Sequence, residues 1–134
     1  MNASPTPIEL PGLSVKLVRI LYRRAKDVSP DRPHCFMYSI EIRNQSDVPF
    51  TLKARKWVVT HSDGSIVVVE GDGVVGQTPT IPPGGEFSYE SQHFIDTPSA
   101  YAEGSYLGLD PSGRRIVVRI PRFGMQAPAL FSDE

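Results

Sequence analysis

Alternation of apolar and polar residues with a period of two is the feature that most constrains how this chain folds. The clearest stretch is 36–43, in which apolar side chains occupy every second position, namely Phe36, Tyr38, Ile40 and Ile42. A strand with one buried face needs this pattern, because successive side chains point to opposite faces of a sheet. Further apolar and β-branched runs predict strands at 14–22, 50–60, 66–69, 86–91, 105–109 and 114–120.

Turn-forming residues separate these runs and set the fold class. They stand at 44–47, 62–65 and 110–113. The run 14–22 would also fit one face of a helix, but its β-branched residues favour a strand. Elsewhere no ten-residue stretch combines helical spacing with freedom from Pro and Gly. About seven short strands with turns between them predict an all-β, Ig-like two-sheet sandwich.

The length of 134 residues fits one domain with one core. We expect a flexible N-terminal segment at 1–13, a sandwich domain at 14–130 and a tail at 131–134. The single cysteine, Cys35, excludes an intramolecular disulfide. The start of the chain shows neither a basic patch nor an apolar run typical of a secretory signal, so we expect a cytoplasmic protein.

Net charge and hydropathy argue against two classes of partner. The net charge is only −1. A nucleic-acid-binding protein usually carries a strong basic excess, because its affinity comes largely from neutralising phosphates. No run approaches the roughly 20 apolar residues of a membrane-spanning helix. We therefore expect neither a nucleic-acid nor a membrane partner.

A glycine-rich motif follows the predicted strand 66–69. Residues 71–76 read Gly-Asp-Gly-Val-Val-Gly, which matches the G-x-G-x-x-G pattern of dinucleotide-binding folds. In those folds a helix follows the glycines, whereas here 77–85 contains three prolines and two glycines. Two interpretations stay open. The loop at Gly71, Gly73 and Gly76 could bind an anion through backbone N–H groups, or its glycines could supply positive φ angles, which we favour.

Other candidate sites are weaker. Asp63, Glu70 and Asp72 lie around one predicted hairpin and could hold a hard cation weakly, although a solvated acidic loop is the favoured interpretation. The histidines and Cys35 have no spacing typical of a transition-metal site, so we expect no metal centre and no cofactor.

Catalytic chemistry has no recognisable motif in this chain. Ser91 and His93 form the closest Ser/His pair and would share a strand face, but an unrelated pair on the surface is the favoured interpretation. We therefore assign no catalytic residue and expect a protein that is not an enzyme.

Several segments, taken in chain order, resemble the ApaG family over about residues 14–130. The matching motifs are 36–46 with its final Asn44-Gln45-Ser46, Arg55-Lys56-Trp57, the run 71–79, Ile81-Pro82-Pro83-Gly84, 87–91, Thr97-Pro98, Gly104-Ser105-Tyr106 and Ile120-Pro121-Arg122-Phe123. The chain differs from the family pattern at Ala100 and Ala102, in a stretch that we expect to be a loop of altered shape.

The resemblance implies an Ig-like or fibronectin type III-like sandwich and no established enzyme activity. It also implies a link to cobalt resistance and magnesium efflux, a use as an interaction module, and proposals of pyrophosphate or nucleotide binding at the glycine motif. We expect a non-enzymatic binding module with a protein partner, and edge-strand pairing could also give a homodimer. Anion binding at Gly71, Gly73 and Gly76 is the alternative.

Overall fold

A computed structural model of the chain describes residues 6–27 and 29–128, and these residues form strands and no helix. The strands are β1 (Ile8–Glu9), β2 (Leu13–Arg24), β3 (His34–Asn44), β4 (Phe50–His61), β5 (Ile66–Asp72), β6 (Thr80–Ile81), β7 (Glu86–Ile95), β8 (Ser99–Leu109) and β9 (Arg115–Gln126). Within these ranges there is accordingly no helix long and apolar enough to cross a membrane.

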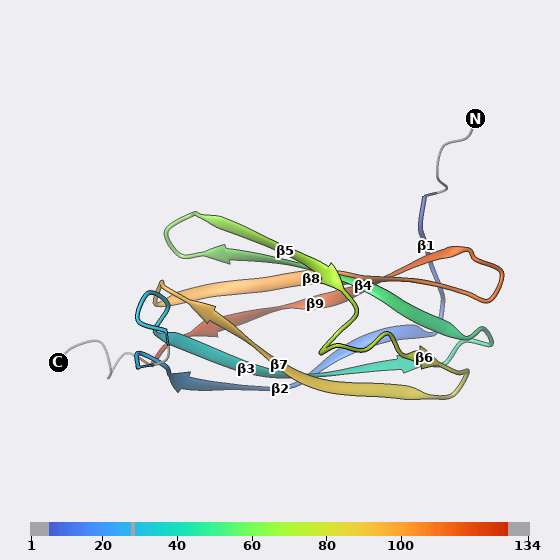
Figure 1. Cartoon of the computed structure of the whole chain (residues 1–134), viewed down its shortest axis with the longest axis horizontal. Coiled ribbons are helices and arrows are strands. Elements are labelled where there is room, and N and C mark those ends of the chain that lie inside the picture. The colour runs from blue at the N-terminus through green and yellow to red at the C-terminus, as the bar shows by residue number, and fades with distance from the viewer. Residues whose placement is uncertain (1–5, 28, 129–134) are drawn as a thin grey trace.

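The strands form two sheets that face each other as layers (Figure 1). The larger sheet has the order β1-β9-β8-β4-β5, and the short β6 also pairs with β4. The smaller sheet has the order β2-β3-β7. The predicted two-sheet β-sandwich is therefore confirmed. β5 and β7 are edge strands of the two sheets, and a groove described below lies between them.

The predicted alternation in 36–43 is also confirmed. Phe36, Tyr38, Ile40 and Ile42 of β3 are each no more than 4% exposed and face the larger sheet. Burying an aliphatic or aromatic side chain of this size contributes about 1.5–3 kcal/mol. The inner face of β3 is thus a main source of the stability of the sandwich.

Two expectations about irregular segments meet a different structure. Ile8–Glu9, inside the expected flexible segment 1–13, pairs in parallel with β9, and Leu13 is buried. Ala100 and Ala102 lie in strand β8 and are buried, so the loop expected around them is wrong. Both alanines face the core, where the alternation of β8 requires apolar residues. Residues 1–5 and the expected tail 131–134 lie outside the described ranges, and the domain boundaries stay a prediction.

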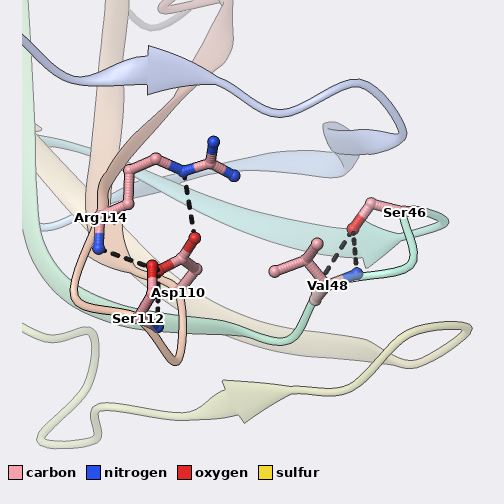
Figure 2. Close-up of polar contacts among 5 residues, drawn as sticks. All are labelled: Ser46, Val48, Asp110, Ser112 and Arg114. Carbon is pink, nitrogen blue, oxygen red and sulfur yellow. Dashed lines mark hydrogen bonds and ion pairs between the residues drawn. The ribbon is translucent and has the colours of Figure 1, made fainter.

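Asp residues organise two of the predicted turns. Figure 2 shows Asp110, whose Oδ1 accepts hydrogen bonds from the Ser112 N–H at 2.9 Å, the Ser112 hydroxyl at 2.7 Å and the Arg114 N–H at 2.9 Å. These bonds, with that from Ser112 Oγ foremost, lower the pKa of Asp110. Asp63 accepts the same pair of bonds from Ser65 in the turn between β4 and β5.

Asn44 is a fully buried polar side chain that joins three segments. Its Nδ2 donates to the carbonyls of Val48 at 2.8 Å and Ile81 at 2.9 Å, while its Oδ1 accepts from the N–H and the hydroxyl of Ser46. Ser46 in turn bonds both backbone groups of Val48 (Figure 2). The end of β3, the turn after it and β6 are therefore held by one amide group.

We predict that Asn44→Ala lowers the free energy of unfolding by roughly 2–3 kcal/mol, because it leaves buried carbonyls without donors. Urea denaturation followed by circular dichroism measures the change. Ser46→Ala is the control and should cost only about 1 kcal/mol, since it removes no donor to Ile81. A loss for Asn44→Ala no larger than that for Ser46→Ala would contradict the prediction.

Candidate functional site

The glycine motif after β5 forms a tight reversal that inserts one valine into the core. Val74 and Gln77 exchange two backbone hydrogen bonds of 2.8 Å, and the two residues between them, Val75 and Gly76, have φ angles of +42° and +78°. Positive φ at both central residues defines a type I′ turn. Val74 is only 1% exposed. The motif therefore reverses the chain and anchors it at the same time.

Arg55 covers the start of this motif. Its Nη1 donates to the carbonyls of Asp72 at 2.9 Å and Gly73 at 3.0 Å. A Cβ atom on Gly71 would lie 2.8 Å from the Arg55 guanidinium, so glycine at this position lets the side chain lie flat on β5. The Arg-x-Trp and Gly-x-Gly motifs of the sequence thus meet in one structural unit.

Two of the backbone N–H groups of this loop are used in hydrogen bonds within the chain. The Gly73 N–H donates to the Lys53 carbonyl at 2.8 Å, and the Val74 N–H donates to Gln77. The positive φ angles of Gly73 (+61°) and Gly76 agree with the interpretation that these glycines serve backbone geometry. Anion binding at Gly71, Gly73 and Gly76 stays a prediction that no observation in the structure supports.

The three acidic residues proposed for a cation are used separately. Asp63 holds its own turn, Glu70 lies 3.9 Å from the Lys56 ammonium, and Asp72 is exposed at the far end of β5. Among residues 6–27 and 29–128, no three His, Cys, Asp or Glu side chains gather in a way that could hold a metal ion. The seven-residue length of β5 separates the hairpin turn from its acidic end, so the expected cation site is not assembled.

The Ser91 and His93 pair is expected to be an unrelated pair on the surface, but His93 packs among aromatic rings. His93 stacks on Tyr38 with ring centroids 4.8 Å apart and meets the edge of Trp57 at 4.8 Å. Its Nε2 atom is buried and has no hydrogen-bond partner among the described residues. Burial lowers the pKa of His93 to about 4. A general base must be oriented by a further polar group, and this imidazole is a neutral member of the core instead.

An aromatic cluster that sequence reasoning did not find surrounds His93. It joins Tyr38, Tyr89 and His93 of the smaller sheet to Trp57, Tyr106 and Phe123 of the larger sheet. The hydroxyls of Tyr89 and Tyr106 hydrogen-bond to each other across the two layers. Burial raises the pKa of both phenols, so they stay protonated.

The free edge of β5 is the most unusual surface of the molecule. Ile66, Val67, Val68 and Val69 are 62%, 45%, 53% and 41% exposed, and they are consecutive. The sequence predicts this strand but assigns it no role. The signal was a run of four apolar residues without polar alternation, which is typical of a strand in contact with something on both faces.

A groove of about 430 Å³ lies beneath this edge, between β5 of the larger sheet and β7 of the smaller one. Val59, Val67 and Val69 line one side, and His93 and Ile95 line the other. Arg32 and Asp96 add one charge of each sign to its lining. The edge strand therefore presents an apolar inner face above an open space as well as unpaired backbone groups.

Comparison with known proteins assigns the family. The model of the ApaG domain matches residues 25–109. The chain belongs to the ApaG domain family. Protein ApaG from Shewanella frigidimarina is 37% identical over 119 residues, which are 89% of this chain and 94% of that protein.

Solved structures support the ApaG assignment and its fold. One X-ray structure of a structural-genomics target superimposes with a TM-score of 0.80 at 32% identity, covering 92% of each chain. A crystal structure of a protein from Bordetella pertussis gives a TM-score of 0.78 at 28% identity, covering 92% of this chain and 99% of that one. The fibronectin type III-like sandwich implied by the resemblance is thus shared with these ApaG-type structures.

Val75 gives a prediction about backbone strain. A β-branched residue at positive φ is strained by roughly 1–2 kcal/mol, whereas Asn-Gly is a preferred type I′ pair. We predict that Val75→Asn raises the free energy of unfolding by about 1 kcal/mol, measured by urea denaturation. Val75→Thr is the control, because it adds polarity but keeps the β-branch, and should bring no such gain.

Gly76→Ala tests the same turn in the opposite direction. Nothing lies within 4 Å of the added Cβ, so the φ of +78° isolates the backbone effect. We expect a loss of about 1 kcal/mol. Unchanged stability in both Val75→Asn and Gly76→Ala would contradict the turn geometry.

His93 gives a prediction about pH. Unfolded histidine has a pKa near 6.5, whereas folded His93 has a pKa of about 4, so only the unfolded state takes up this proton between those values. Stability is therefore lost as the pH falls from about 6.5 to 4, by roughly 3 kcal/mol in total from this residue. Urea unfolding of the wild type and His93→Phe at pH 7 and pH 4 should show a much smaller acid loss in the variant. Equal acid losses in the two proteins would contradict the prediction.

Proposed function

We propose that this protein is a non-enzymatic module that binds another polypeptide chain by strand addition at the free edge of β5. The observation that carries the proposal is the open edge itself, with four consecutive exposed apolar residues above a groove that has both apolar and polar lining residues. A strand that joins an exposed sheet edge gains affinity from backbone hydrogen bonds, and alternate side chains in a groove give specificity.

The chemistry of the described residues supports a binding role over a catalytic one. The buried polar atoms of the aromatic cluster belong to the core, and the buried Nε2 of His93 has no hydrogen-bond partner among the described residues. The Gly-Asp-Gly-Val-Val-Gly loop uses its Gly73 and Val74 amides for the reversal after β5. Family membership by itself names no reaction.

The link to cobalt resistance and magnesium efflux is part of this proposal as an indirect effect. The absence of a ligand cluster among residues 6–27 and 29–128 favours a role through a bound protein over direct capture of the cation. We also propose that the protein acts in the cytoplasm, where the free and buried Cys35 stays reduced.

The test compares partners of the wild type with those of two variants at Val68. The Val68 N–H points to the open edge, so Val68→Pro removes an edge donor while the bonds between β4 and β5 remain. Val68→Thr is the matched control, because it keeps both the N–H and the β-branched shape. We expect affinity purification from the native cell, after chemical cross-linking, to recover the same partner with the wild type and Val68→Thr and to lose it with Val68→Pro.

Circular dichroism and melting of all three proteins must show an intact fold. Recovery of the same partner with Val68→Pro, or of no specific partner with the wild type, would contradict the proposed function.

A further inference from the structure

We propose that β5 of a second copy of this chain is the resting occupant of the β5 edge, paired antiparallel about a two-fold axis through Val68. The inference rests on the proposed function, because it identifies what covers the same edge before another protein competes for it. Its basis is the direction of the backbone groups, the position of the charges and the state of the other edges.

The hydrogen-bond pattern of β4 and β5 shows which backbone groups are open. The His61 N–H donates to the Ser65 carbonyl at 2.8 Å at one end, and the Gly73 N–H donates to Lys53 at 2.8 Å at the other. Because bonded pairs recur at every second residue in an antiparallel ladder, the odd-numbered residues of β5 face β4. The N–H and C=O groups of Ile66, Val68 and Glu70 therefore point away from the sheet.

A two-fold axis perpendicular to the sheet restricts the register of self-pairing. Residues that lie opposite each other must point to the same face, so the axis must pass through a residue and not between two. With the axis at Val68, Val68 lies opposite its own copy, and Ile66 lies opposite Glu70 of the second copy. Ile66, Val68 and Glu70 of each strand are then bonded, and one continuous sheet runs through both copies.

Charge selects this register over the next one. An axis at Val69 would place the two Glu70 carboxylates in diagonally adjacent positions on one face, where like charges are destabilising. An axis at Val68 separates them by four residues along the strands, roughly 13 Å. In this register Asp72 lies opposite Gly64 of the second copy, so it does not face another acidic residue.

The inner face gains a matching contact. Val67 and Val69 point into the groove between β5 and β7, and in this register each lies opposite the other residue of the second copy. Four valines then form one apolar layer across the two grooves. On the outer face, the exposed Val68 is brought beside its own copy, and the exposed Ile66 lies diagonally next to the Val68 of the second copy.

The other sheet edges are protected in ways that the uncharged run 66–69 of β5 is not, and the two acidic residues of β5, Glu70 and Asp72, follow that run. β1 has two residues, β2 carries Lys16, Arg19, Arg23 and Arg24 and an irregular register between Leu17 and Arg19, and β7 carries Glu86 and Glu90. Short length, charge and bulges are the usual devices that prevent pairing between sheet edges. Within the described ranges, β5 is thus the edge best suited to accept a second copy.

The test measures both self-association and register. A single strand pair is a small interface, so we expect the weight-average mass of the wild type in sedimentation equilibrium to rise from monomer to dimer with concentrations up to about 1 mM. Val68→Pro should stay monomeric over the same range, and Val68→Thr should behave as the wild type. If Val68→Pro does not fold, Val68→Lys replaces it, because a lysine on the edge opposes pairing.

Register is tested by cross-linking of single-cysteine replacements on two edges. A short bismaleimide should join Val68→Cys to itself at least about tenfold faster than Val18→Cys, because opposite Cα atoms in a bonded pair lie about 5.5 Å apart. Val18, on the edge strand β2, is 57% exposed and is the matched control, while the native Cys35 is buried in both variants.

A wild type that stays monomeric, or equal cross-linking of the two variants, would overturn the inference. If the wild type is monomeric but Val68→Pro still loses its cellular partner, the second copy is excluded and the proposed function stands. If the wild type dimerises through Val68 but Val68→Pro still recovers the same cellular partner, the dimer stands and the proposed function fails.

Discussion

The contact between the two sheets through aromatic rings is the interaction on which the rest of the structure depends. Tyr38 and Trp57 approach from opposite layers with centroids 5.1 Å apart, and Phe123 packs on both. Each strand that contributes a ring must turn its alternate residues outward, which determines what remains available at the surface. The same contact buries the Nε2 atom of His93 and the hydroxyls of Tyr89 and Tyr106. Groups that look reactive in the sequence are therefore part of the packing.

The sequence was sufficient where a local rule decides the outcome. The alternation in 36–43 predicts the inner face of β3, since burial on one side of a sheet follows from the period of two. The turn around Asp110 is equally local, because the bonds that Asp110 makes with Ser112, Gly113 and Arg114 span at most four positions of the sequence. The class of fold followed from such segments together.

Long-range neighbours could not be predicted in the same way. The sequence favours an unrelated surface pair for Ser91 and His93, because no local pattern shows that Tyr38 and Trp57 flank His93 from two different strands. The role of Asn44 depends on the carbonyl of Ile81, thirty-seven positions away in the chain. The edge position of β5 depends on the order of the whole sheet, which no segment of the sequence contains.

The glycine motif and the β5 strand form one continuous structural unit. Arg55 and Val74 fix the end of β5 against the sheet, and the register between β4 and β5 has no bulge. The reversal after β5 thus lies next to a strand whose other side is unpaired. The glycine motif 71–76 and the edge strand β5 are therefore structurally linked.

The parallel pairing of β1 with β9 has a consequence for biosynthesis. Ile8 pairs with Ile116, so β1 has no partner strand until residues more than 100 positions later have been synthesised. Domains dominated by such distant pairings fold slowly, and those emerging from the ribosome leave strands uncovered meanwhile. Pairing of β1 with β9 is therefore a late event in the assembly of the larger sheet, because it requires residues 116 and 117 to have left the exit tunnel.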